Sequence, residues 1–106
     1  MNPREKRYPV MEPGVMRIQG KPDHVYVVTV LDVSKSGLRV SCASSLPAAT
    51  QVEVKCRRAG VTGEIRYCRD VKPTEFNLGI KAYEASSSAG PQAAGRVDLT
   101  LLFKVI

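Results

Sequence analysis

Hydrophobic and polar residues alternate along much of this chain, with the two-residue period of a β-strand. The segment 51–57, Gln-Val-Glu-Val-Lys-Cys-Arg, places its apolar side chains on one face and its polar side chains on the other. The segment 38–42 repeats this alternation, and 24–31 is apolar on both faces, which predicts a strand covered on both sides. Further strands are predicted at 15–19, 63–68 and 76–83.

Turn-forming residues separate these predicted strands. Proline, glycine, serine and aspartate gather between them, for example at 21–23 (Lys-Pro-Asp) and at 34–37 (Ser-Lys-Ser-Gly). Short strands at this spacing, with no helical period between them, indicate an antiparallel barrel or sandwich. Closure into a barrel also removes exposed sheet edges. We therefore expect an all-β protein with six antiparallel strands, arranged as a barrel or a sandwich.

The chain divides into four expected segments. Residues 1–12 form a flexible basic N-terminal arm, and residues 13–84 form the barrel. Residues 85–95 are rich in serine, alanine and glycine and are expected to form a flexible linker. Residues 96–106 are strongly apolar, with a period that fits either a strand or one face of a helix. For this segment we expect a short helix that covers the barrel or a second copy.

Composition and charge restrict the class of protein. The 106 residues include 16 Lys and Arg against 10 Asp and Glu, a net charge of +6, and suit one domain with a modest core. No apolar run approaches the roughly 18–20 residues of a membrane-spanning helix. No apolar run follows the charged start, as it would in a secretory signal. We therefore expect a cytoplasmic protein with no membrane span.

Residue types that carry catalytic or metal chemistry are sparse. Cys42, Cys56 and Cys68 form no Cys-x-x-Cys pair, so we expect small buried side chains rather than a zinc or redox site. His24, the single histidine, has no evident partner and is expected at the surface. No nucleophile is paired with a base, and no glycine-rich phosphate loop follows a strand. We expect no enzyme, no metal and no cofactor.

Two polar segments remain as candidate binding chemistry. One is the basic stretch 4–7 (Arg-Glu-Lys-Arg) in the expected arm, and the other is 32–37 (Asp-Val-Ser-Lys-Ser-Gly) between two strands. Asp32 and Ser34 can bind backbone N–H groups ahead of them. Gly37 permits a positive φ or the close approach of another molecule.

The order of these features resembles the PilZ domain family. A basic arm is followed by Tyr-Pro-Val at 8–10, the pattern D-x-S-x-x-G occupies 32–37, and 63–69 with 76–80 is similar to that family's last strand pair. The resemblance covers about residues 3–83. It implies a small barrel that binds the bacterial second messenger cyclic di-GMP and relays it to an unidentified partner protein. The family grips this ligand with an R-x-x-x-R arm and the [D/N]-x-S-x-x-G loop.

The resemblance assigns the ligand to Arg4, Arg7, Asp32, Ser34, Gly37 and Arg39. The loop motif matches position by position, but Pro3 stands where the first arginine of the arm belongs. Arg4 and Arg7 are three residues apart, and in an extended arm such residues point to opposite sides. Loss of one charge-assisted pair lowers affinity roughly ten- to a hundredfold.

Two other functions stay open. Pro3 and the apolar C-terminal segment favour a degenerate PilZ-like domain that binds a protein and no nucleotide. A basic barrel could also bind single-stranded nucleic acid through Lys55, Arg57, Arg58, Arg66 and Arg69. Aromatic residues are too scattered for base stacking, so nucleic acid is the least favoured ligand. We expect a monomer or a weak dimer.

Overall fold

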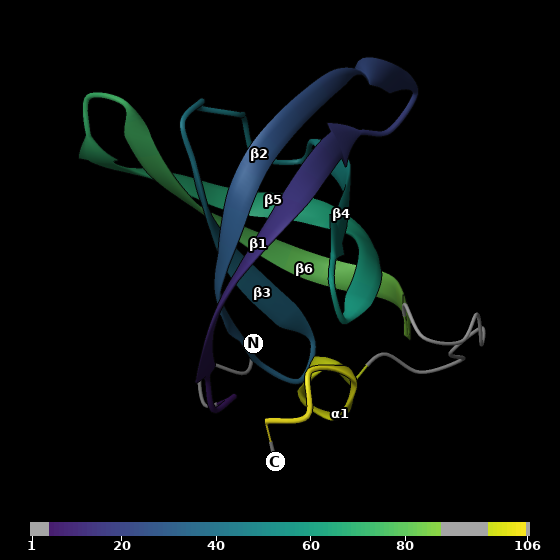
Figure 1. Cartoon of the computed structure of the whole chain (residues 1–106). Helices are drawn as coiled ribbons and strands as arrows, with labels where there is room; N and C mark the ends of the chain where they lie inside the picture. Colours follow the sequence, from purple (N-terminus) through teal and green to yellow (C-terminus); the bar gives the residue numbers. More distant parts are fainter. Residues whose placement is uncertain (1–4, 88–97, 106) are drawn as a thin grey trace.

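Residues 5–87 and 98–105, which this computed structural model describes, form six antiparallel strands closed into a barrel and one short helix (Figure 1). The order around the barrel wall is β1-β2-β3-β6-β5-β4, and β4 pairs with β1 to close the ring. The strands are β1 (Tyr8–Ile18), β2 (Lys21–Val33), β3 (Gly37–Cys42), β4 (Gln51–Cys56), β5 (Ala59–Lys72) and β6 (Glu75–Ser87). The predicted all-β, six-stranded architecture is confirmed.

The barrel interior is filled by the apolar residues that alternate along each strand. In β4, Val52 and Val54 are buried, whereas Gln51 and Lys55 face solvent. The other strands fill the core in the same way, with Met16, Val28, Val30, Leu38, Val40, Ile65, Leu78 and Ile80 buried. One face of each strand meets the core and the other meets water, which explains why alternation predicted most of the strands.

β2 is not covered on both sides, so that prediction was wrong. Val28 and Val30 face the core, but Val25 is 46 % exposed and Val27 is 80 % exposed. Strands covered on both faces belong to sheets with helices on each side. In the described part of this chain no second layer lies over the outer face of β2, and its outer valines meet solvent. His24 is exposed, as expected.

The barrel extends beyond the predicted range 13–84 at both ends. β1 begins at Tyr8, so residues 8–12 of the predicted arm pair with the end of β2 and belong to the barrel wall. β6 continues to Ser87, so residues 85–87 of the predicted linker are a strand paired with β5. The remainder of the predicted linker lies outside the described residues.

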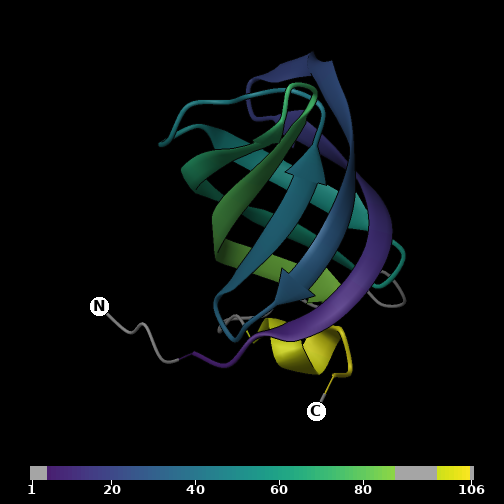
Figure 2. The ribbon, with the colours of Figure 1, turned by 90° about the vertical axis from the view of Figure 1, so that its left-hand side faces the viewer.

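The apolar C-terminal segment forms a one-turn helix, α1 (Leu99–Leu102), against one end of the barrel (Figure 2). Asp98 caps α1, because its carboxylate accepts the Thr100 N–H at 3.1 Å. Leu99 and Phe103 are fully buried and belong to the same core as the strands. The expected helix is confirmed, and it covers the barrel of its own chain.

An ion pair between the buried Glu12 and the exposed Arg58 joins elements at the same end of the barrel. Glu12 of β1 lies with a carboxylate oxygen 3.2 Å from Nε of Arg58, and it also accepts the Arg58 backbone N–H at 3.1 Å. The Arg58 guanidinium donates to the Phe103 carbonyl beside α1. Arg58 therefore joins β1, the β4–β5 turn and α1. Arg58 is exposed, but its guanidinium already contacts Glu12 and Phe103, which makes it less available to a nucleic-acid phosphate.

The cysteines serve mainly as packing residues. Cys42 is buried, and Cys56 and Cys68 are half-buried. Burial raises the pKa of the Cys56 thiol. Within the described residues, no group of three or more His, Cys, Asp or Glu side chains could hold a metal ion. No helix in the same residues has the length and apolar character needed to cross a membrane.

Candidate ligand-binding site

The loop between β2 and β3 is held in shape by backbone hydrogen bonds. The Ser34 N–H donates to the Gly37 carbonyl at 2.8 Å, and the Ser34 hydroxyl donates to the same oxygen at 3.3 Å. The carbonyl groups of Lys35 and Ser36 accept backbone N–H groups from α1 and β6 respectively. The loop is therefore supported by two neighbouring elements as well as by its own turn.

Glycine is required at position 37 because of close packing. A Cβ on Gly37 would lie 2.8 Å from the Ile80 carbonyl oxygen of β6, closer than side chains normally approach. Gly20 has a positive φ of 80°, but Gly37 does not lie in that region. The approach of β6, rather than a left-handed turn or a ligand, explains this glycine in the structure.

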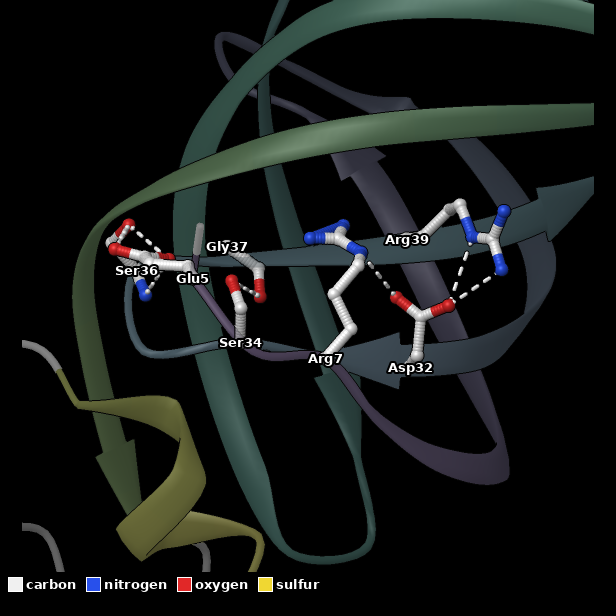
Figure 3. Close-up of polar contacts among 7 residues, drawn as sticks. All are labelled: Glu5, Arg7, Asp32, Ser34, Ser36, Gly37 and Arg39. Atoms are coloured by element: carbon white, nitrogen blue, oxygen red, sulfur yellow. Dashed lines mark hydrogen bonds and ion pairs between the residues drawn. The ribbon is translucent and has the colours of Figure 1, made fainter. Parts of the chain in front are cut away.

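Asp32 lies buried between two arginines (Figure 3). A bulge at Leu31 shifts β2 against β3, so Asp32 pairs with Arg39 on the outer face of the wall instead of pointing into the core. Asp32 Oδ2 lies 2.6 Å from Nη2 and 2.9 Å from Nε of Arg39. Asp32 Oδ1 lies 3.1 Å from Nε of Arg7. One carboxylate therefore pairs with both guanidinium groups, by hydrogen bonding and charge to Arg39 and by charge to Arg7.

A carboxylate from the chain itself occupies the loop (Figure 3). Glu5 accepts the Ser36 backbone N–H at 3.2 Å, and the Ser36 Oγ lies 2.9 and 2.8 Å from its two carboxylate oxygens. Burial opposes the charged form, but hydrogen bonds from Ser36 and Ser34 and the charge of Arg7 leave the pKa of Glu5 below its ordinary value. The loop can thus hold an anionic oxygen group.

An open pocket of about 560 Å³ lies between the arm, this loop and strands β5 and β6. Its lining comprises Glu5, Arg7, Ser34, Ser36, Gly37, Arg66, Tyr67, Gly79, Ile80 and Lys81. Three of these side chains are cationic and one, Glu5, is anionic. The balance of charge in the pocket favours an anionic ligand.

Tyr67 provides an aromatic wall of the pocket. It lies opposite Gly79 in the β5–β6 register, just after a bulge in β5. A Cβ on Gly79 would overlap the Tyr67 ring, so the ring packs directly on the glycine backbone. The Arg69 guanidinium lies 5.0 Å from the ring centroid. Contacts with Gly79 and Arg69 therefore keep the ring in a defined position.

The structure brings together most of the residues assigned from the sequence. Arg7, Ser34 and Gly37 line the pocket, whereas Asp32 and Arg39 are outside its lining, with Asp32 paired to both Arg7 and Arg39. Arg4 lies outside the described residues. Arg7 and Ser34 therefore share one concave surface, which is the arrangement that the resemblance required.

Apart from Arg66, six residues of the pocket lining were not assigned to the ligand from the sequence, namely Glu5, Ser36, Tyr67, Gly79, Ile80 and Lys81. Glu5 lies two positions before Arg7, and residues two apart on an extended segment face the same side. That spacing could have indicated Glu5. Lys81 pairs with Gly37 across β3 and β6, a relation that only strand pairing reveals.

A comparison with protein-family models decides the family. The model for the PilZ domain matches residues 2–89, which is most of the chain and includes all the residues that line the pocket. This chain belongs to the PilZ domain family. A search of curated proteins finds no match. PilZ domains are receptor and adaptor domains related to cyclic di-GMP and are generally not enzymes, so this PilZ domain belongs to a binding class.

Proposed function

We propose that this PilZ domain is a cyclic di-GMP receptor that relays binding of the nucleotide to a partner protein. The observation that carries the proposal is the geometry of two adjoining groups. Arg7 forms an ion pair with the buried Asp32, and beside it the Ser36 N–H and hydroxyl already hold a carboxylate. A phosphate could take the same donors from that carboxylate.

The ligand's phosphates and guanine edges match the groups of the pocket. Ser36 would donate to a phosphate oxygen, and the planar fork of Arg7 would bind phosphate or the guanine O6 and N7 atoms. Arg66 and Lys81 add positive charge, and Tyr67 offers apolar surface to a purine. The pocket volume lies within the roughly 300–1,000 Å³ that is usual for small-ligand sites.

The remaining assigned residues support this contact indirectly. Arg39 would keep the Asp32 carboxylate in place, Asp32 would attract the Arg7 guanidinium, and Ser34 would hold the shape of the loop. Arg4 is proposed as an auxiliary clamp. Ligand binding would replace the Glu5–Ser36 contact by a phosphate contact and so change how the arm lies on the barrel. A partner protein that contacts the arm could distinguish the two states.

Isothermal titration calorimetry with cyclic di-GMP tests this proposal. We expect saturable binding at micromolar ligand concentrations. Cyclic di-AMP has the same phosphates but lacks the guanine O6 acceptor, so it should bind at least about tenfold more weakly. No heat from either dinucleotide with tens of micromolar protein would contradict the proposal.

The alternative is a PilZ-like domain that binds a partner protein and no nucleotide. Pro3 at the position of the first arginine favours it, and so does the Glu5 carboxylate in the anion-binding loop. In that case Glu5 stays on Ser36 at every ligand concentration. The same titration separates the two functions.

Replacing Glu5 by alanine is expected to raise the affinity for cyclic di-GMP about three- to tenfold. The substitution removes a carboxylate that competes with phosphate for Ser36, and such charge-assisted bonds near a surface have modest strength. Glu84→Ala is the matched control, because Glu84 is exposed on β6 and lies outside the pocket lining. Calorimetry should show less than a roughly twofold change for this control. An unchanged affinity for Glu5→Ala would show that Glu5 does not compete.

The Glu5–Ser36 contact should persist at neutral pH and be lost in acid. The pKa of Glu5 in the folded protein is lower than its ordinary value of 4.5. The stabilisation is therefore complete above that value and disappears as pH falls through the lowered pKa. In NMR spectra the Ser36 amide resonance should move only below about pH 4.5 and should stay still in Glu5→Ala. A wild-type resonance that does not move would argue against the contact in solution.

A further inference from the structure

β2 extends well beyond its neighbour β3 (Figure 1). β3 pairs only with residues 28–33 of β2, whereas β1 pairs with β2 from Lys21 onward. Among the described residues, nothing pairs with the second side of segment 21–27. Alternate N–H and carbonyl groups of this segment point to that side, so the closed barrel still has a short free strand edge.

One end of the free edge lacks the residues that usually block pairing with another strand. Natural sheets block open edges with charged residues or proline. β5 also extends beyond its neighbour β4, and its overhanging part contains Arg66, Arg69, Asp70 and Lys72. On β2, residues 21–24 are Lys-Pro-Asp-His, but Val25 and Val27 are exposed and the residue between them, Tyr26, is uncharged. The edge at 25–27 is therefore open to another strand.

A hollow of about 400 Å³ lies beside this edge. Val27 and Thr29 of β2 form one wall, and Cys42 marks the end of β3. Lys72, the last residue of β5, and Glu75, the first residue of β6, also line the hollow. The hollow lies where β3 would continue if it did not leave the sheet. It gives an added strand a place for a side chain next to the exposed Val27.

We propose that an extended segment of a partner protein pairs with the free edge at 23–27 as an additional strand. Its backbone would satisfy the open N–H and carbonyl groups, and apolar side chains at alternate positions would pack beside Val25 and Val27. Arg17 is the cross-strand neighbour of Val25, and Lys21 begins the edge. With a net charge of +6 on the chain, the favoured segment carries acidic residues around its apolar positions. This proposal is independent of nucleotide binding.

A second copy of this chain fits the edge less well. β3 already occupies the place beside Val28. In an antiparallel pair of two β2 edges, the two-fold axis could therefore lie no later in the strand than Val25. That pairing would set Val27 against Asp23 of the other copy, and Pro22 next to it has no N–H to donate. Two chains with a charge of +6 also repel each other.

A peptide array tests the proposal with the whole chain. Its eight-residue peptides carry valine, isoleucine, leucine or phenylalanine at alternate positions, and glutamate, aspartate or threonine between them. We expect some of these peptides to bind with a dissociation constant below about 1 mM, measured by fluorescence anisotropy. Binding should slow amide hydrogen exchange at 23–27. The double variant Val25→Lys, Val27→Lys should lower the affinity at least about tenfold, because it introduces the charges that block an edge.

Val71→Lys is the matched control, because Val71 is 48 % exposed on the overhanging part of β5. It should change peptide affinity less than about twofold. The proposal is overturned if no peptide binds, or if the binding peptides protect amides away from the β2 edge. It is also overturned if the wild-type chain dimerises and the double lysine variant is monomeric, because that result identifies a second copy as the occupant. Circular dichroism confirms that each variant is folded.

Discussion

Replacing Arg7 by alanine is expected to lower the affinity for cyclic di-GMP about ten- to a hundredfold. In the proposed complex Arg7 makes a charge-assisted, bidentate hydrogen bond to the ligand. One such contact contributes about 1.5–3 kcal/mol to the binding free energy. Asp32 holds the guanidinium before the ligand arrives, so little side-chain freedom is lost on binding. Isothermal titration calorimetry measures the affinity of both proteins under the same salt conditions.

Two further variants make this result specific. Arg57→Ala removes an exposed arginine from the β4–β5 turn, outside the pocket, and should change the affinity less than about twofold. Arg7→Lys keeps the positive charge but loses the planar fork, so its affinity should be closer to that of Arg7→Ala than to wild type. Equal affinities of wild type and Arg7→Ala would place the nucleotide outside this pocket.

Replacing Phe103 by alanine is expected to lower the free energy of unfolding by about 3–5 kcal/mol. Phe103 is the largest of the fully buried side chains, and it closes one end of the barrel together with Leu99. Its removal leaves a cavity beneath a single helical turn. Because domains of this size have about 5–15 kcal/mol of stability in total, the loss is a large share. Urea unfolding followed by circular dichroism measures it.

Leu101→Ala is the control from the same turn. Leu101 is 62 % exposed, so its truncation should change the free energy of unfolding by less than about 0.5 kcal/mol. If Phe103→Ala lowered the free energy of unfolding as little as Leu101→Ala, the C-terminal segment would add little to the core. The comparison also concerns the site, since the Leu99 N–H donates to the Lys35 carbonyl of the ligand-binding loop at 3.0 Å. Loss of α1 packing would remove one support of that loop.

Local sequence patterns were sufficient for the presence of the strands and for the position of the loop, but not for the full length of each strand. Alternation predicted a strand at 51–57, and β4 spans Gln51–Cys56. The motif at 32–37 was placed between two strands, and it runs from the end of β2 to the first residue of β3. Both results depend on neighbouring residues along the chain, because side-chain alternation and turn formation are local properties.

The directions in which the site's side chains point, and the contacts between them, could be known only from the tertiary structure. The bulge at Leu31 turns Asp32 outward, and a shift of one residue reverses the face of every later side chain in a strand. Glu5 contacts Ser36 across 31 positions of sequence. Tyr67 rests on Gly79 because of the β5–β6 register. No local pattern contains these relations.

The sequence by itself therefore determined that this protein is a barrel of alternating strands with a PilZ-type loop between the second and third strands. Only the tertiary structure decided that Asp32 forms ion pairs with Arg7 and Arg39, and that Glu5 binds Ser36 in the loop. It also decided that part of β2 has a free edge. The physical reason is that alternation acts over two residues. Pairing register, bulges and unequal strand lengths arise only when distant segments meet.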